Sequence, residues 1–267
     1  MNLTIIPNYC KQKYRITNIL HKDVVDMSKF DKHTEQIREL YNQADSVWPE
    51  KDPWHSYTKQ SIESKIYEWA NTEDSDLILN AGSGGTVYNI KGTMVHLDIA
   101  DNKINFFKNY IVGSIEDIPV ESNKYDYVIC VGSVLNYTQI IPSLNELYRV
   151  LKPGGYLIVE FERTNSAGLW FTSNYGKNCV YKKYKYNSQE HGLWLYSEKF
   201  ILQTLEVMGM KKLDIFRFHS LSSVYGRFCT DINIITSKTK YDKVLKKFNY
   251  FSAHNCMLLC QKSIIEV

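Results

Sequence analysis

The sequence lacks the features that place a chain in a membrane. No apolar run approaches the roughly 20 residues that span a bilayer, and the first residues, MNLTIIP, have neither a basic start nor a long apolar core. We therefore expect no membrane segment and no signal peptide, and a cytoplasmic location.

Cysteine pairs are also missing. The six cysteines are scattered along the chain, and none forms a Cys-x-x-Cys pair. This pattern is typical of free thiols in a reducing compartment. Cys256 and Cys260 share one face of an expected strand but have no nearby residues that would complete a metal site, so no metal is expected.

The sequence has little excess charge of either sign. Its 32 Lys and Arg residues against 29 Asp and Glu residues give a formal net charge of +3, too small to indicate nucleic-acid binding. The apolar fraction of 44% and the charged fraction of 23% are ordinary for a globular protein. A chain of 267 residues can form one large α/β domain or two small ones, and we favour one domain with a lid.

The most informative stretch is a buried strand that runs into a glycine turn, DLILNAGSGG at residues 76–85. An apolar run between Asp and glycines is typical of a central parallel strand. Gly82, Gly84 and Gly85 allow the backbone to turn sharply and to approach a ligand closely. We interpret the stretch as a cofactor site, with a plain β-to-α turn as the alternative, because short glycine motifs occur by chance.

Further signals follow downstream in a fixed order. The run MVHLD predicts a second strand that ends in Asp98, a carboxylate able to accept hydrogen bonds from ribose hydroxyls. Residues 110–119 and 125–132 each predict a strand followed by a turn. Residues 146–155 end an amphipathic helix with Pro and Gly, and the run at 156–161 predicts the next strand.

In order and spacing, residues 77–161 resemble the class I S-adenosylmethionine-dependent methyltransferases of the small-molecule type, and RVLKPGG at 149–155 is the most specific segment. The resemblance implies an α/β fold with a Rossmann-like, doubly wound sheet of seven strands. That sheet would be mostly parallel with an antiparallel last strand, and N-terminal helices and an aromatic-rich insertion would be added to it. It also implies that S-adenosyl-L-methionine is the cofactor and that a methyl group passes by in-line displacement to an oxygen, nitrogen or carbon nucleophile of a small molecule.

The resemblance assigns cofactor contacts by position. The glycine turn would approach the methionine and ribose portions, Asp98 would take the ribose hydroxyls, and Ile99 would lie on the adenine face. The cofactor-binding residues implied in this way are Asn80, Ala81, Gly82, Ser83, Gly84, Asp98, Ile99, Ser114, Ile115, Val131 and Ser133.

Three positions depart from the family pattern and keep a second hypothesis open. Asn80 stands where the family has an acid, Thr86 where it has a third glycine, and Ser114 where it has Asp. The alternative is a non-catalytic or regulatory protein that keeps the methyltransferase fold. A nicotinamide-dependent oxidoreductase is not supported, because Val87 occupies the last glycine position of Gly-x-Gly-x-x-Gly.

The N-terminal part predicts two helices, one over residues 33–47 and one that starts at Ser56 or Thr58 and continues to Ala70. We divide the chain into a helical cap or lid, residues 1–72, and a methyltransferase domain, residues 73–267, with an insertion at about 163–195. Between the helices, the ring-rich segment 48–57 is either a packed corner or a lid that contributes His55 or Tyr57 to the substrate pocket.

The insertion mixes aromatic residues with lysines. Rings suit a planar or apolar acceptor and lysines an anionic one, although the alternation at residues 180–186 also fits a β-hairpin with one solvated face. If a general base is needed, His191 at the end of the insertion is the first candidate and His55 the second, with His219 also considered.

The turn after the fourth strand excludes one class of acceptor. Methyltransferases that act on DNA amino groups carry Asp, Asn or Ser followed by Pro-Pro-aromatic there, whereas this chain has GSVL at 132–135, and it has no Pro-Cys nucleophile either. DNA is therefore not expected, and the expected partner is a small-molecule acceptor, aromatic or anionic. RNA or protein acceptors and a homodimer remain open.

Overall fold

The computed structural model of the protein describes residues 27–44, 46–48, 52–186, 189–226, 228–229, 231–242 and 246–264. The chain divides into two compact units, residues 1–37 and residues 38–267, and the second unit contains the sheet and every site discussed below. The five cysteines among the described residues are free thiols. Of the helices formed by these residues, none is both long and apolar enough to cross a membrane.

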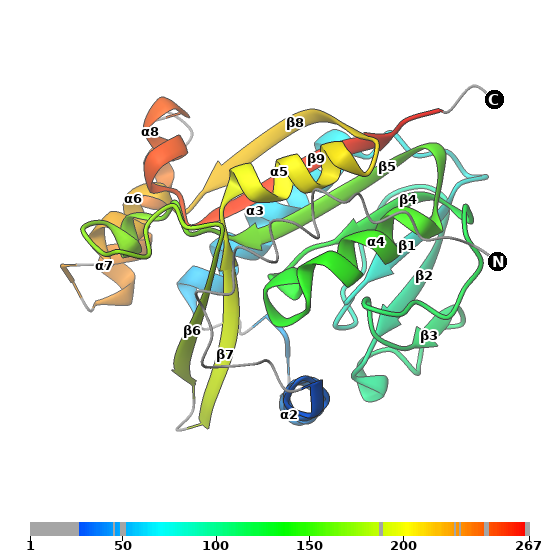
Figure 1. Ribbon diagram of the computed structural model, residues 1–267, viewed down its shortest axis with the longest axis horizontal. Coiled ribbons are helices and arrows are strands. Elements are labelled where there is room, and N and C mark those ends of the chain that lie inside the picture. The colour runs from blue at the N-terminus through cyan, green and yellow to red at the C-terminus, as the bar shows by residue number, and fades with distance from the viewer. Residues whose placement is uncertain are drawn as a thin grey trace. The chain divides into compact units, whose positions relative to one another are not determined.

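Seven strands form the main sheet, in the order β3-β2-β1-β4-β5-β9-β8 (Figure 1). Strands β1 to β5 pair in parallel, and β9 lies antiparallel between β5 and β8. This arrangement confirms the predicted doubly wound sheet with an antiparallel last strand. The strands are β1 (Leu77–Ala81), β2 (Thr93–Asp98), β3 (Tyr110–Val112), β4 (Tyr125–Cys130), β5 (Leu151–Glu162), β8 (Met210–Phe218) and β9 (Asn255–Lys262).

Helices cover both faces of the sheet, which explains why the strands read as continuous apolar runs. In Figure 1, α4 (Ile140–Val150) and α5 (Glu198–Val207) lie in front of the sheet and α3 (Pro53–Trp69) lies behind it. Leu79 of β1 packs in one buried cluster with Leu144 of α4. Its neighbour Ile78 packs in the other cluster with Ile62 of α3, because successive strand residues point to opposite faces.

The two predicted N-terminal helices are present, with different ends. The first, α2 (Met27–Gln43), begins and ends earlier than expected. The second, α3, is capped by Asp52, whose Oδ1 accepts hydrogen bonds from the backbone N–H of Trp54 at 2.8 Å and of His55 at 3.4 Å. The prediction of a cap at Ser56 or Thr58 was wrong, because Pro53 suits the first helical position and starts the helix there.

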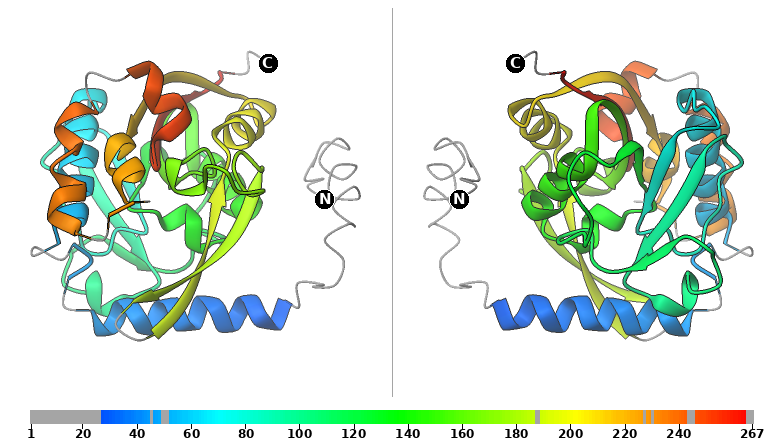
Figure 2. Two further views of the ribbon diagram at one scale, coloured as in Figure 1. Left: turned by 90° about the vertical axis from the view of Figure 1, so that its left-hand side faces the viewer. Right: turned by 90° about the vertical axis from the view of Figure 1, so that its right-hand side faces the viewer.

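The insertion after β5 forms the predicted β-hairpin. It contains a short 3-10 turn, η4 (Ala167–Leu169), and the antiparallel strands β6 (Cys179–Tyr186) and β7 (Gln189–Tyr196). Figure 2 shows this hairpin as a ribbon distinct from the main sheet. Strand β7 contacts η3 (Val134–Tyr137), the 3-10 turn that follows β4, so the hairpin lies at the carboxyl edge of the sheet.

The connection from β8 to β9 is built from short helices. They are α6 (Ser220–Tyr225), α7 (Ile232–Thr236), η5 (Thr239–Tyr241) and α8 (Lys246–Ser252), and a further 3-10 turn, η2 (Asp101–Lys103), follows β2. The Asp242 carboxylate accepts hydrogen bonds from the backbone N–H groups of Ser220 and Leu221, which joins the end of η5 to the start of α6.

Candidate functional site

The glycine turn after β1 has no room for larger residues. Gly82, Gly84 and Gly85 have φ angles of 69°, 52° and 79°, in the region that side chains other than glycine rarely adopt. A Cβ atom at Gly82 would lie 2.5 Å from Cγ1 of Val134, and one at Gly84 would lie 2.8 Å from Cγ1 of Val47. The turn is therefore packed closely against Val134 of the β4 turn and against Val47, and we call residues 82–85 with these contacts the glycine cradle.

Asp98 ends β2 beside this cradle, as the sequence predicted. Its Oδ2 accepts the Gly84 N–H at 2.7 Å, and its Oδ1 accepts the Ala100 N–H at 2.8 Å. Burial raises the pKa of Asp98, and these backbone hydrogen bonds partly oppose that rise. Each carboxylate oxygen keeps a second lone pair that can accept from a ribose hydroxyl.

Two of the departures from the family pattern join in one network. The Asn80 amide donates to the Thr86 carbonyl oxygen at 2.8 Å, a bond that a carboxylate could not donate. The Thr86 hydroxyl oxygen accepts from the indole N–H of Trp48 at 3.0 Å. Trp48 also lies over the β4 turn, because a Cβ at Gly132 would be 3.5 Å from its Cζ2. Asn80 and Thr86 thus hold the glycine turn and attach the segment that lies over it.

The residues expected around adenine follow β2 and β3. Ile99 is half-buried after Asp98, and Ile115 is buried. The Ser114 hydroxyl oxygen accepts the Glu116 N–H at 3.1 Å, which forms a tight turn after β3. Ala81 and Ser83 are both buried within the glycine turn. All of these predicted positions lie at the carboxyl edge of β1, β2 and β3, where open α/β sheets bind ligands.

The turn after β4 is held by a residue that the sequence analysis did not identify, Glu160 of β5. Ser133 adopts a left-handed conformation with φ of 60° directly after Val131 and Gly132. The Ser133 N–H donates to Oε2 of Glu160 at 2.6 Å, and the Asn255 amide donates to Oε1 of Glu160 at 2.7 Å. Glu160 is fully buried on β5, and this burial raises its pKa to about 7 against the lowering effect of the two hydrogen bonds.

A second polar group extends from the end of β5. His254 Nε2 lies 3.1 Å from Oε2 of Glu162, and His254 Nδ1 lies 3.2 Å from the hydroxyl of Ser166. That hydroxyl is 2.9 Å from the hydroxyl of Ser223. None of these residues was predicted as a site residue. The sequence did contain one signal for a polar site here, because two acidic residues, Glu160 and Glu162, lie two positions apart at the end of an otherwise apolar strand.

The predicted histidines are in different surroundings. His55 Nδ1 lies 2.6 Å from Oδ2 of Asp52, and its side chain is 39% exposed at the first turn of α3. His219 is buried, stacks on Trp54 with ring centroids 3.6 Å apart, and lies 2.8 Å from the Thr58 hydroxyl. Burial lowers the pKa of His219 well below its usual value, so its ring is neutral at pH 7. His191 pairs with Tyr184 through the backbone, but its side chain lies outside the described part of the structure.

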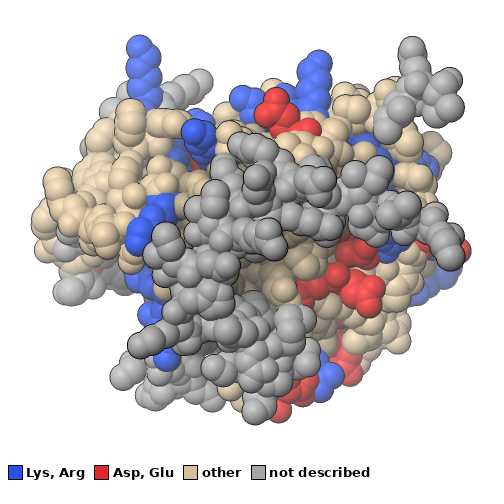
Figure 3. All heavy atoms as spheres, in the orientation of Figure 1, with Lys and Arg blue, Asp and Glu red and all other residues tan. Residues whose placement is uncertain are grey.

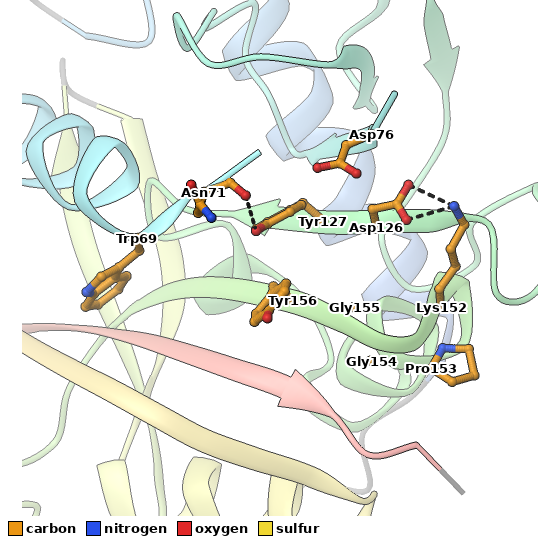
Figure 4. Close-up of a pocket in the computed structure, with 10 residues that line it drawn as sticks. All are labelled: Trp69, Asn71, Asp76, Asp126, Tyr127, Lys152, Pro153, Gly154, Gly155 and Tyr156. Atoms are coloured by element: carbon orange, nitrogen blue, oxygen red, sulfur yellow. Dashed lines mark hydrogen bonds and ion pairs between the residues drawn. The ribbon is translucent and has the colours of Figure 1, made fainter. Parts of the chain in front are cut away.

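A separate cavity of about 430 Å³ lies at the opposite, amino edge of the sheet (Figure 4). It is bordered by the stacked rings of Tyr127 and Tyr156 and by an ion pair in which Lys152 Nζ lies 2.8 Å from Asp126. Ligands of open α/β sheets bind at the carboxyl edge, so this cavity is not the cofactor site. Within the described ranges, no group of three or more His, Cys, Asp or Glu side chains could hold a metal ion.

The chain is similar to known methyltransferases in sequence and in fold. Residues 76–159 match the methyltransferase domain family. The chain is similar to the mitochondrial 2-methoxy-6-polyprenyl-1,4-benzoquinol methylase of Bos taurus, with 30% identity over 130 residues. The match covers 47% of this chain and 38% of that protein, so the chain spans well under two thirds of the relative's length.

Two solved structures share the fold. The 1,6-didemethyltoxoflavin-N1-methyltransferase of Burkholderia thailandensis covers 91% of this chain and 92% of its own, with a TM-score of 0.55 and 10% identity. The geranyl diphosphate C-methyltransferase of Streptomyces coelicolor covers 86% and 98%, with a TM-score of 0.54 and 9% identity. Residues 76–159 are therefore similar to a methyltransferase domain, and the chain has the Rossmann-like fold of these methyltransferases that its motifs predicted.

Proposed function

We propose that the protein is an S-adenosylmethionine-dependent methyltransferase that methylates a small molecule. The observation that carries the proposal is the meeting of three turns at one edge of the sheet. The Gly84 N–H bonds to Asp98 at 2.7 Å, and Gly82 lies so close to Val134 of the β4 turn that no Cβ fits between them. A cradle without Cβ atoms beside a buried carboxylate suits the ribose and methionine parts of the cofactor.

The cofactor contacts follow from this arrangement. Asp98 would accept hydrogen bonds from the ribose hydroxyls, Ile99 would contact the adenine face, and Ser114 and Ile115 would border its edge. Val131 and Ser133 would line the end of the cleft nearest the acceptor. Bound S-adenosylmethionine supplies a methyl group that its sulfonium already activates, so the protein has to align the two reactants and exclude water.

A small planar molecule is the acceptor class that the site supports best. The His219 ring contacts the rings of Trp54 and Tyr57, and Trp54 also contacts His254, which lies 3.1 Å from Glu162 at the end of β5. The printed name of the Bos taurus relative describes a benzoquinol acceptor, which is also a planar ring. The two solved structures are named as N- and C-methyltransferases. The fold alone therefore does not select the atom that is methylated.

Charge distribution does not favour DNA. On the face that Figure 3 shows, the described Lys and Arg side chains lie at separate places among uncharged and acidic residues. Binding to a phosphate backbone calls for a basic stripe or patch. The cytoplasmic location, the homodimer and the cap at residues 1–72 stay predictions.

The rival hypothesis, a non-catalytic protein on the same fold, rests on the departures at Asn80, Thr86 and Ser114. The hydrogen bonds from Asn80 to Thr86 and from Trp48 to Thr86 argue against this hypothesis, because they hold the glycine turn in shape without the residues that the family usually has there. A regulatory protein would bind the cofactor without turnover on any acceptor.

Calorimetric titration of S-adenosylmethionine and S-adenosylhomocysteine tests the proposal. We expect micromolar binding that Asp98→Ala weakens at least tenfold, or about 1.4 kcal/mol. Asp74→Ala is the matched control, because Asp74 is exposed in the turn before β1. Well-folded protein that binds neither ligand would exclude the proposed function.

A further inference from the structure

Glu162 lies where the acceptor would meet the cofactor. It is the last residue of β5, and its side chain is 17% exposed at the carboxyl edge. Ser133, on the turn that would line the methyl-bearing end of the cofactor, is close enough to Glu162 for its side chain to lower the pKa of that carboxyl group. Glu162 is therefore next to the reacting centre and still accessible from the cleft.

His254 fixes this carboxylate from the other side. Because a carboxylate only accepts hydrogen bonds, Nε2 of His254 carries a proton and donates it to Oε2 of Glu162 at 3.1 Å. Nδ1 lies 3.2 Å from the Ser166 hydroxyl, which is in turn 2.9 Å from the Ser223 hydroxyl. Both ring nitrogens are occupied, so the imidazole cannot rotate away from Glu162 without losing two hydrogen bonds.

The charges around Glu162 favour its ionised form. Three charged or titratable groups face it: His254 before β9, Lys182 on β6 and Glu160 on β5. Burial raises the pKa of Glu162, but the nearby charge and hydrogen bond of His254, the Ser133 side chain and Lys182 outweigh it, so the pKa lies below its usual value. The carboxylate is thus available as a proton acceptor at neutral pH.

An aromatic wall lies beside the pair. The Trp54 ring meets the His254 ring edge to face, with centroids 5.7 Å apart and an angle of 71° between the planes. The Trp54 ring also stacks on the ring of His219, which is neutral because burial lowers its pKa. A flat, uncharged wall next to one carboxylate fits a planar ring that presents a hydrogen-bond donor.

We propose that Glu162 is the general base of the methyl transfer, that His254 positions it, and that the acceptor is a planar ring bearing a hydroxyl or amino group. The inference rests on the proposed function. A lone pair of the acceptor oxygen or nitrogen forms the new bond to the methyl carbon, the carbon–sulfur bond breaks with its electrons staying on sulfur, and the acceptor proton passes to the Glu162 carboxylate.

Initial rates with a defined set of probes test the proposal. The probes are hydroquinone, catechol, 4-aminophenol and aniline, and release of S-adenosylhomocysteine is followed over a range of pH. For the probe that reacts best, Glu162→Gln should lower kcat by about 100-fold or more, while KM and the affinity for S-adenosylhomocysteine stay within about threefold. Glu121→Gln is the matched control, since the Glu121 side chain is 89% exposed.

His254→Gln tests the positioning role. The variant removes the interactions that lower the pKa of Glu162, so the acidic limb of the kcat profile should move to higher pH. A loss of packing alone would lower the rate without moving that limb.

Three outcomes of these measurements would each contradict a different part of the proposal. Turnover by Glu162→Gln at the wild-type rate would overturn the assignment of the base. Binding of S-adenosylhomocysteine without turnover of any probe would overturn the acceptor class and leave the proposed function standing. Failure of the wild type to bind S-adenosylhomocysteine would instead remove the proposed function and this inference together.

Discussion

The indole N–H of Trp48 donates to the hydroxyl oxygen of Thr86 across 38 positions of sequence, at 3.0 Å. This bond attaches the segment before α3 to the glycine turn, where the family pattern has a third glycine. One departure from the pattern thus holds another part of the site in place.

A double-mutant cycle measures this bond through the cofactor site. Trp48→Phe keeps a ring but loses the donor, and Thr86→Val keeps the volume but loses the acceptor. A net hydrogen bond contributes about 1 kcal/mol, so each change should weaken S-adenosylhomocysteine binding about fivefold, and the double variant should bind no more weakly than either single one. Additive effects in calorimetry would show that the bond does not couple the two segments.

Gly82→Ala should abolish cofactor binding. The new methyl group would lie 2.5 Å from Cγ1 of Val134, at a φ of 69°, so the β4 turn has to move. We expect the affinity for S-adenosylhomocysteine to fall more than about 100-fold. Val134→Ala in the same chain should recover part of it, because the contacts with the two Cγ atoms are removed, while a 3.1 Å contact with Cβ of residue 134 and the backbone strain stay. Gly168→Ala is the control, since no atom lies closer than 3.6 Å to the added carbon.

Glu160 should make stability depend on pH. Its pKa is raised to about 7 in the folded protein, from 4.5, so the folded state binds more protons than the unfolded state between these values. The resulting stabilisation is present at low pH and is lost as pH rises through 7, by on the order of 2 to 3 kcal/mol. His219, whose pKa is lowered by burial, acts in the opposite direction and loses its stabilising effect as pH falls.

The difference between the wild type and Glu160→Gln separates these effects. Denaturant unfolding at about pH 5.5 and about pH 8.5 gives the free energy of unfolding of each protein. Relative to the variant, the wild type should lose stability at the higher pH. Equal pH dependence in the two proteins would show that Glu160 titrates as an ordinary carboxyl group.

Removing the charge of Glu198 should destabilise the fold strongly. Its carboxylate lies 3.2 Å from fully buried Arg163 and 2.6 Å from Arg217. Glu198→Gln leaves the two guanidinium groups without the negative charge that pairs with them, and it should lower the free energy of unfolding by about 3 to 5 kcal/mol. Glu206→Gln changes an exposed residue of the same helix and should have almost no effect. Similar midpoints for both variants in thermal unfolding would refute this account.

The sequence predicts the glycine turn and the end of β2 well because their signals are local. A glycine turn needs neighbouring residues only, and Asp98 is recognised as the end of one apolar run. The proposed acceptor side could not be predicted in this way. His254 meets Glu162 from 92 positions away, and only the antiparallel insertion of β9 beside β5 brings the two together.

One local signal was placed too late along the chain. The cap of α3 is Asp52 and not Ser56 or Thr58, because Asp52 and Pro53 together form a stronger helix start.

Strand β9 is the last strand in the chain, yet it lies between β5 and β8. During synthesis, β5 and β8 therefore emerge from the ribosome with no partner between them, and the sheet is completed only when residues 255–262 are released. His254 and Asn255 arrive with that strand. A nascent chain can thus form the glycine turn early, but the contacts of His254 with Glu162 and of Asn255 with Glu160 form only after β9 has inserted.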